Sequence, residues 1–246
     1  MQIDRAEIFF FIIINCMDNQ FSRLELLIGA DNVSKLAQKR VAVFGIGGVG
    51  GYVLEALVRS GVGEIDIIDN DAVDITNLNR QIISLHSNIG QYKVDVAQQR
   101  MLDINPNVKI NKHRTFYTEK TADEFDFSQY DYIADAIDTV SGKLSLIEEA
   151  KRNDVKIICA MGAGNKLNPM MFEVADISKT SVCPLAKVIR GELKKRNIKD
   201  VKVVYSKECP IKQSADLRKS PASNSIVPAV VGLLMANEII NDLIKD

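Results

Sequence analysis

VAVFGIGGVGGYVLEALVRSGVGEIDIIDND, residues 41–71, is the stretch of this chain that decides its fold. A short apolar run, Val41–Phe44, leads into a loop with five glycines, and an amphipathic helical pattern follows the loop. A second apolar run, Ile65–Ile68, ends at Asp69. A strand, a glycine turn, a helix, a second strand and an acidic residue, in this order, are typical of a nucleotide-binding βαβ unit.

Phosphate binding requires a backbone that can turn tightly and approach the ligand closely. Four glycines of this loop can provide it: Gly45, Gly47, Gly48 and Gly50. One glycine permits the tight turn, one lets the backbone approach phosphate, and one lets the helix lie close to the strand. The start of the helix offers free N–H groups and a positive dipole end to an anion. Asp69 stands where a carboxylate can accept hydrogen bonds from ribose hydroxyls. A glycine turn that serves only helix packing is the alternative, and the loop does not identify the nucleotide.

Downstream of this unit the chain keeps alternating between short apolar runs and amphipathic stretches. Strands are predicted at residues 108–114, 132–134 and 156–160, and helices at residues 93–105 and 141–153. This alternation predicts a Rossmann-like, doubly wound α/β fold with a mostly parallel sheet and helices on both faces. Residues 72–92 are predicted to form a long irregular loop, which is usually functional or disordered. Residues 121–130 are predicted to form a short helix.

The second half of the chain is expected to extend the sheet by mixed strands and a C-terminal helix. It predicts a strand between two loops in residues 161–185, a basic helix at 184–196, a strand at 201–205 and an apolar helix at 227–244. No linker is evident, so residues 17–246 are expected to form a single domain. Residues 1–16 are left out of the fold because Met17 starts a polar segment. Whether they are native or a non-native or disordered extension stays open.

The composition is that of a soluble globular protein: 246 residues, 46% hydrophobic and 26% charged. The formal net charge is −1, so no global field points to nucleic acid or to a membrane. The charge is nevertheless uneven, because residues 187–219 hold eleven Lys or Arg and only four Asp or Glu. This segment is either a platform for nucleic-acid phosphates or a solvated amphipathic helix. In the second case its inward residues are Val188, Ile189 and Leu193, and its outward residues are Lys194, Lys195 and Arg196.

The four cysteines, Cys16, Cys159, Cys183 and Cys209, stand far apart and form no CxxC pair. This spacing argues against a structural zinc site and against a secreted disulfide framework, so a reducing cytoplasm is the expected setting. No apolar run approaches the length of a transmembrane helix, and no membrane association is expected.

Two kinds of nucleotide chemistry fit such a βαβ unit. A hydride-transfer enzyme with NAD(P) needs a positioned acid or base, but the only histidines, His86 and His113, are more simply explained as surface or packed side chains. ATP chemistry needs cations around the phosphates and carboxylates for Mg²⁺. Residues of these types follow or flank the predicted strand ends, where the crevice of an open α/β sheet lies: Asp69, Asp71, Arg80, Lys93 and Asp138.

The segments GIGGVG, IDNDAVDITNLNRQ, GQYKVD and AIDT, in this order, resemble the adenylating enzymes of the ubiquitin-activating type, whose bacterial members are the ThiF/MoeB/HesA adenylyltransferases. The resemblance implies that the motif glycines and Asp69 hold ATP and that Asp138 binds Mg²⁺. It also implies phosphate contacts from Asn77, Arg80, Gln81 and Lys93. An arginine in an early Ser-Arg segment reaches the partner subunit's ATP in dimers of this family, and Arg23 fits that position. A homodimer is therefore expected.

Within that family, the second half resembles the tRNA threonylcarbamoyladenosine dehydratases. The stretches that carry this resemblance are AIDTVSGKLSLIEEA, MGAGNKLNP, FEVADISKTSVCPLAKVIRGELKKR and KVVYSKE. Members of this group use ATP to activate the carboxylate of a threonylcarbamoyl side chain on tRNA. The activated acyl group then closes into a ring, and AMP and pyrophosphate are released. On this interpretation residues 187–219 are a candidate tRNA platform.

Three alternatives to the dehydratase stay open. The first is an adenylyltransferase that activates the C-terminus of a ubiquitin-like sulfur carrier and works with a cysteine desulfurase or sulfur acceptor. In that case Cys183 or Cys209 could act as a nucleophile, although an inert cysteine is the simpler explanation for each. The second is an NAD(P)-dependent oxidoreductase, and the third is a nucleotide-sensing protein that binds ATP without turnover.

Overall fold

The computed structural model describes residues 19–212 and 221–245, so residues 1–16 lie outside the described part of the chain. Within it, seven strands form one sheet in the order β3-β2-β1-β4-β5-β7-β6. Neighbouring strands are parallel except β6 and β7, which are antiparallel. The strands are β1 (Arg40–Phe44), β2 (Glu64–Ile68), β3 (Lys109–His113), β4 (Tyr132–Asp135), β5 (Lys156–Ala160), β6 (Phe172–Asp176) and β7 (Lys202–Ser206).

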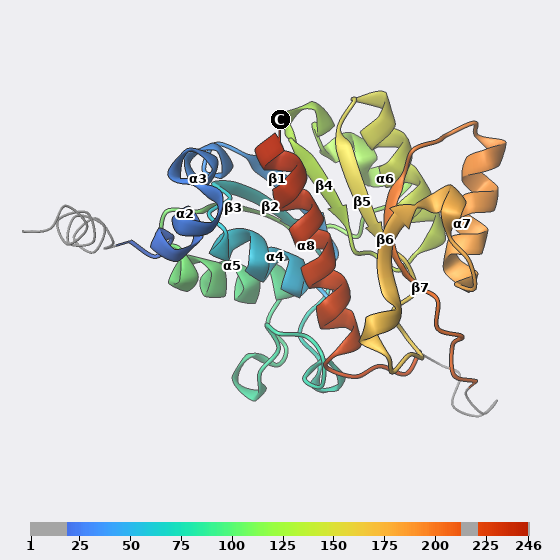
Figure 1. The fold of residues 1–246 in the computed structure, drawn as a ribbon. Helices are drawn as coiled ribbons and strands as arrows, with labels where there is room; N and C mark the ends of the chain where they lie inside the picture. The colour runs from blue at the N-terminus through green and yellow to red at the C-terminus, as the bar shows by residue number, and fades with distance from the viewer. Residues whose placement is uncertain (1–18, 213–220, 246) are drawn as a thin grey trace, which may run out of the picture.

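Helices cover both faces of this sheet (Figure 1). One face carries α3 (Ala30–Leu36), which follows α2 (Ser22–Ile28), together with α4 (Gly50–Arg59), α5 (Lys93–Ile104) and α8 (Val227–Lys245). The other face carries α6 (Val140–Arg152) and α7 (Pro184–Lys195). Both faces of β1 are buried, since Val41 and Val43 join one core and Ala42 and Phe44 the other. The predicted doubly wound, mostly parallel α/β fold is confirmed.

The predicted helix at residues 121–130 is wrong. The chain forms two 3₁₀ turns instead, η3 (Glu119–Glu124) and η4 (Phe127–Gln129). Phe125 and Phe127 both pack on Phe44, with ring centroids 5.5 and 6.2 Å away. Residues two apart face different sides of an α-helix, so a helix could not bury both rings against one partner. Helix α3 was not predicted either.

The C-terminal helix α8 corrects one expectation about the membrane. It has 19 residues and contains an 18-residue window with a mean hydropathy of 1.5, so by length and composition alone it could cross a bilayer. However, 50% of its most apolar window is buried in the fold. Val231, Met235 and Ile239 lie in the core that α8 shares with α4 and the sheet (Figure 1). The apolar character of α8 is therefore explained by its packing.

The strand order creates a topological switch point beside β1. The chain runs from β1 to β2 and β3 on one side, and then returns to β4 on the other side of β1. The segments after β1 and β4 therefore leave the sheet in opposite directions at its carboxyl edge. Ligands of open α/β proteins bind at such a switch point.

Candidate nucleotide-binding site

The glycine loop after β1 combines two crowded positions with one open position. Gly45 has a φ of +87°, and a Cβ there would lie 2.9 Å from the carbonyl oxygen of Ala136. A Cβ at Gly50 would lie 1.8 Å from the Gly45 carbonyl oxygen, so only glycine fits. At Gly47 the nearest atom, Nε2 of Gln81, is 3.9 Å away. The loop is thus tightly packed on the turn after β4 and on the start of α4, and it is open on the side of Gln81.

Asp69 ties the end of β2 to this loop. Its Oδ2 accepts a hydrogen bond from the Ile46 amide at 2.7 Å, and its Oδ1 accepts one from the Asp71 amide at 2.8 Å. Burial raises the pKa of Asp69 above its ordinary value, while Lys93 acts against that rise. Lys93, at the start of α5, is buried, and its Nζ lies 2.7 Å from Asp71 and 3.9 Å from Asp69. One buried cation therefore stands between two carboxylates at the carboxyl edge.

The irregular segment 72–92 borders the open side of the glycine loop. It contains the 3₁₀ turns η1 (Ile75–Asn77) and η2 (His86–Asn88). Arg80 lies close to Gly48, where an added Cβ would be 3.4 Å from Arg80 Cγ. Its Nη1 donates to the carbonyl of Thr76 at 2.7 Å. The buried Asn77 shapes this turn, because its Oδ1 accepts a hydrogen bond from the Asp74 amide at 3.0 Å.

Asp138 lies in the turn that follows β4. The preceding residues of this turn contact the glycine loop, since both Ala136 and Ile137 lie against Gly45. Asp138 itself is exposed, and within the described part of the chain it has no hydrogen-bond or ion-pair partner. A free carboxylate beside the glycine loop is available to a cation.

A buried ion pair lies at the start of this turn, and it was not predicted from the sequence. Lys143 of α6 and Asp135 of β4 are both 0% exposed, and Lys143 Nζ lies 3.0 Å from each Asp135 oxygen. The buried Cys159 thiol also hydrogen-bonds to this carboxylate, and burial raises the pKa of that thiol well above its ordinary value. The sequence pattern that could have indicated it is a lysine on the apolar side of α6, close to Leu146 and Ile147.

Arg23 is the one predicted site residue that the fold does not bring to the glycine loop of its own chain. It is exposed on α2, which is preceded by Phe21. The Phe21 ring lies 3.4 Å from the Cβ position of Gly61, just before β2 begins. This contact places α2 near the C-terminal end of α4, whereas the glycine loop lies at its N-terminal end.

Neither histidine belongs to this site by its contacts. His86 is exposed in η2. His113 Nε2 lies 2.8 Å from Oδ1 of Asp66, which is 0% exposed and also binds Arg40 and Asn111. Burial raises the pKa of Asp66, but the hydrogen bonds from His113, Arg40 and Asn111 outweigh it and lower the pKa to about 2. His113 is therefore packed in a structural cluster.

This cluster predicts a pH-dependent stability. Because the folded-state pKa of Asp66 is lower than its ordinary value of 3.8, the stabilisation is present above about pH 4 and is lost as the pH falls toward 2. We expect Asp66→Asn to lower the free energy of unfolding by about 2 kcal/mol at pH 7. Urea unfolding at pH 7 and pH 3 measures this loss, which should shrink at pH 3. An equal loss at both pH values would contradict the assignment.

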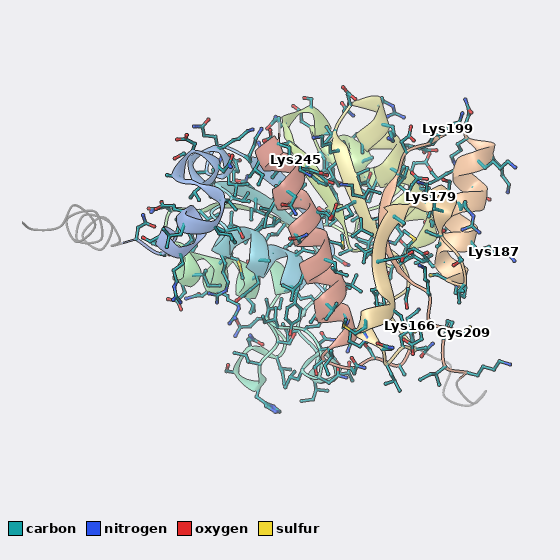
Figure 2. The ribbon with its side chains drawn as sticks, viewed as in Figure 1. Lys166, Lys179, Lys187, Lys199, Cys209 and Lys245 are labelled. Carbon is teal, nitrogen blue, oxygen red and sulfur yellow. The ribbon has the colours of Figure 1, made fainter. Side chains whose placement is uncertain are left out.

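Ion pairs neutralise part of the positive charge of the basic segment, residues 187–219. Lys195 pairs with Glu192 at 2.6 Å, and Lys202 pairs with Asp242 at 2.6 Å. Within the described residues, exposed lysines with no such partner remain on and after α7: Lys187, Lys194, Lys199 and Lys212. Figure 2 shows Lys187 and Lys199 on the side of the molecule that α7 forms. Residues 213–220 of this segment lie outside the described ranges.

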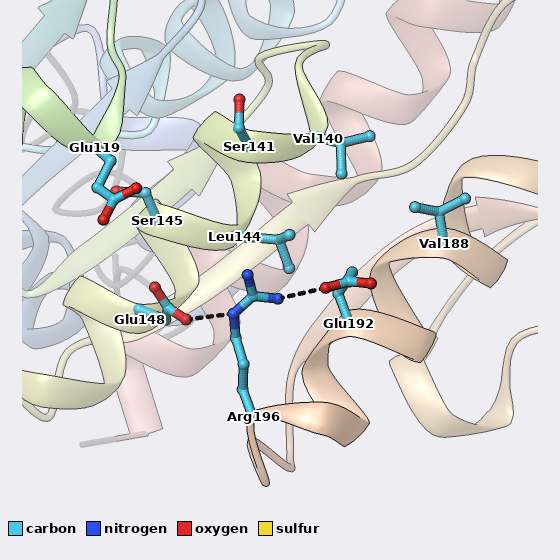
Figure 3. Close-up of a pocket in the computed structure, with 9 residues that line it drawn as sticks. All are labelled: Glu119, Val140, Ser141, Leu144, Ser145, Glu148, Val188, Glu192 and Arg196. Carbon is cyan, nitrogen blue, oxygen red and sulfur yellow. Dashed lines mark hydrogen bonds and ion pairs between the residues drawn. The ribbon is translucent and has the colours of Figure 1, made fainter.

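A cleft of about 530 Å³ separates α6 from α7 (Figure 3). Arg196 lies across it, 2.7 Å from Glu148 and 3.0 Å from Glu192. Val188, expected to face inward, is 48% exposed and lines this cleft, while Ile189 supplies the buried contact. Arg196 is thus neutralised by two carboxylates and is not part of the free basic surface.

The two downstream cysteines differ in exposure. Cys183, just before α7, is buried, and Cys209 after β7 is exposed. Lys166, in the loop after β5, is also buried, and its Nζ donates to the Gly162 carbonyl at 2.7 Å. Burial lowers the pKa of Lys166. Among the described residues, no group of three or more His, Cys, Asp or Glu could hold a metal ion.

The fold and the site together define a nucleotide-binding protein of the doubly wound α/β class. A glycine loop, two carboxylates, a buried lysine and Arg80 gather at the switch point of its sheet. The chain belongs to the ThiF family, which matches residues 17–246.

Comparison with individual proteins narrows this assignment. The chain is 45% identical to the tRNA threonylcarbamoyladenosine dehydratase of Bacillus subtilis over 245 residues, covering 94% of this chain and 96% of the relative. It is similar to the crystal structure of the Escherichia coli tRNA N6-threonylcarbamoyladenosine dehydratase TcdA in complex with ATP. The TM-score is 0.85 at 31% identity, with 92% and 94% of the two chains covered. Escherichia coli MccB with ATP shares the fold alone, with a TM-score of 0.67 at 22% identity and 93% and 64% coverage.

Proposed function

We propose that this chain is an ATP-dependent tRNA threonylcarbamoyladenosine dehydratase. It adenylates the carboxylate of the threonylcarbamoyl side chain on tRNA and then closes that group into a ring. The observation that carries the proposal is the 45% identity to a dehydratase over nearly the whole length of both chains. The proposal is also supported by four features that lie together at one edge of the sheet: the glycine loop, Asp69, Lys93 and Arg80.

Adenylation is chiefly a problem of charge. A carboxylate is a poor electrophile, and its attack on the α-phosphate brings two anions together. The attack forms an acyl-adenylate and releases pyrophosphate, and an attacking nitrogen then displaces AMP as the ring closes. The protein must align the reactants and neutralise their charge, for which Arg80 and the buried Lys93 are suited. Asp69 lies where it can hold the ribose while it fixes the glycine loop.

Lys93 has to change partners in this scheme. In the structure it pairs with Asp71 at 2.7 Å. A triphosphate carries more negative charge than one carboxylate, so phosphate can compete for the ammonium group. We infer that Asp71 keeps Lys93 in place before ATP binds. Asn77 and Gln81 complete the phosphate-facing wall, Asn77 through the turn that it shapes and Gln81 through its amide beside Gly47.

Mg²⁺ is expected to accompany ATP. Carboxylate oxygens are its preferred protein ligands, and Asp138 offers an exposed carboxylate without a partner in the described structure. When bound, the ion supplies charge neutralisation at the phosphates. No structural zinc is expected.

We propose that residues 17–246 act as one adenylating domain in a homodimer. The exposed Arg23 lies near the end of α4 remote from the glycine loop, so it is better placed to serve the ATP of a second subunit than its own. We also propose a cytoplasmic location, because the widely spaced cysteines fit a reducing compartment. A cysteine desulfurase or sulfur acceptor remains a candidate partner only if the carrier-activating alternative holds.

We propose that the unpaired lysines of α7 form the tRNA platform. Each phosphate contact releases counterions, so tRNA affinity should fall steeply with salt. Lys187→Glu combined with Lys194→Glu should reduce the slope of log affinity against log salt by roughly two. Lys245→Glu, which changes the same charge at a site away from α7 (Figure 2), should leave the slope unchanged. Filter binding across a salt series measures both, and equal slopes in all three proteins would exclude α7 from the platform.

One experiment tests the function directly. Purified protein is incubated with ATP, Mg²⁺ and tRNA that carries threonylcarbamoyladenosine, and the tRNA nucleosides are analysed by mass spectrometry. The expected result is loss of one water from the modified nucleoside, with AMP and pyrophosphate released. AMP release with a ubiquitin-like carrier protein, but not with tRNA, would favour the sulfur-carrier activator. Binding of NAD(P) in place of ATP would support an oxidoreductase.

A further inference from the structure

We propose that Lys143 is a positioning residue of the nucleotide site: the buried Asp135–Lys143 ion pair holds the turn 136–139 so that Asp138 faces the bound ATP. The inference rests on the proposed function only for the identity of the nucleotide. Lys143 itself is 0% exposed and cannot touch ATP without a rearrangement of α6. Any effect of Lys143 on ATP binding must therefore act through the turn 136–139.

Three contacts hold the turn, and the first of them comes from the ion pair. Asp135, held by Lys143 at 3.0 Å, accepts a hydrogen bond from the Ile137 amide at 3.2 Å. The same Ile137 packs against α6 at Gly142, where an added Cβ would lie 2.8 Å from Ile137 Cδ1. On its other side the turn meets the glycine loop, because a Cβ at Gly45 would lie 2.9 Å from the Ala136 carbonyl oxygen. The turn is therefore clamped between the ion pair, α6 and the glycine loop.

Asp138 is the residue that depends most on this clamp. It is exposed and has no partner of its own in the described structure, so nothing at its side chain sets its direction. The direction is set by the backbone of the turn, and that backbone is fixed at Asp135. Removing Lys143 leaves a buried carboxylate uncompensated, which would then rearrange or take up a proton. The turn would loosen and Asp138 would point less consistently toward the phosphates.

The test compares three variants of the full chain. Lys143→Met breaks the pair and leaves Asp135 buried without its partner. The double variant Asp135→Asn with Lys143→Met removes both charges, so it keeps the test possible if the single variant does not fold. Lys202→Met is the matched control, because it breaks a partly buried lysine–aspartate pair of 2.6 Å between β7 and α8. Binding of ATP with and without Mg²⁺ and binding of AMP are measured by calorimetry. Amide exchange at residues 136–139 is measured in the protein without nucleotide.

We expect both Lys143 variants to lose about 10–100-fold in affinity for ATP in the presence of Mg²⁺, as is usual when a supporting partner of a metal ligand is removed. AMP affinity should change much less, since AMP lacks the β- and γ-phosphates and carries less charge for Mg²⁺ to neutralise. Amide exchange of the turn should become faster. Lys202→Met should lower the melting temperature without either effect. Unchanged exchange together with unchanged Mg²⁺-dependent ATP binding in the double variant would overturn the inference.

The outcomes separate this inference from the proposed function. If the wild-type protein binds ATP with Mg²⁺ but leaves tRNA unmodified, the dehydratase proposal fails and the positioning role is still decided by binding. If the wild-type protein binds no ATP, the proposed function fails, and amide exchange of the turn alone decides whether Lys143 holds it. Equal losses in Lys202→Met and Lys143→Met would show general destabilisation and would also overturn the inference.

Discussion

Replacing Asp138 by alanine is expected to lower the rate of AMP formation from ATP and tRNA by about 10²–10³-fold. The physical reason is that Asp138 is a free carboxylate in the turn that packs on the glycine loop. If Asp138 holds Mg²⁺ as proposed, the alanine variant would remove a protein ligand of the ion and leave more of the charge repulsion at the phosphates. ATP–pyrophosphate exchange in the presence of the tRNA substrate measures the adenylation step alone.

The control for this prediction is another exposed aspartate. Asp123 in η3 has no partner in the described structure and does not lie directly after a strand. Asp123→Ala should retain wild-type exchange. Raising the Mg²⁺ concentration should partly restore Asp138→Ala if the defect is metal binding. If Asp138→Ala kept most of the exchange activity, its assignment to Mg²⁺ would be wrong.

The second large effect is expected at Gly50. A Cβ there would stand 1.8 Å from the carbonyl oxygen of Gly45, a backbone atom of a buried loop that cannot simply rotate away. Gly50→Ala must therefore displace α4 from β1. We expect the free energy of unfolding to fall by about 3 kcal/mol or more, at the upper end of what overpacking causes. ATP binding should be lost as well. Urea denaturation and calorimetry measure the two effects.

Gly47→Ala separates packing from phosphate approach. The nearest atom to a Cβ at Gly47 is 3.9 Å away, and its φ is not in the left-handed region, so an alanine fits without strain. We expect wild-type stability together with weaker ATP binding, because a methyl group would take the open space above the loop. Wild-type stability of Gly50→Ala, or unfolding of Gly47→Ala, would show that the two glycines have been assigned the wrong roles.

Local patterns in the sequence predicted the parts of the site that are close together along the chain. The glycine loop, the two flanking strands and Asp69 lie within residues 41–71, and their order alone specifies a βαβ unit. Arg80, Lys93 and Asp138 could also be assigned to the carboxyl edge, because parallel strands end on the same side of a sheet. No pattern could indicate that Lys93 would pair with Asp71, which depends on where α5 begins relative to β2.

The elements that were predicted wrongly or missed are those whose form depends on distant partners. Residues 121–130 were predicted to form a short helix. Instead Phe125 and Phe127 both pack on Phe44, and the chain forms 3₁₀ turns there. Val188 has the position of a buried helix residue, yet the cleft between α6 and α7 leaves it exposed.

The sequence by itself determined the alternation of strands and helices, the glycine turn and the acidic and basic residues at the strand ends. These are local properties, because the side-chain periods of a strand and a helix and the steric freedom of glycine act over a few residues. Only the tertiary structure decided that Lys143 would be buried against Asp135, that Arg23 would lie far from its own glycine loop, and that Arg196 would be neutralised. Each of these depends on burial and charge pairing between separate elements, and a charged residue looks the same in the sequence whether it meets water or a buried partner.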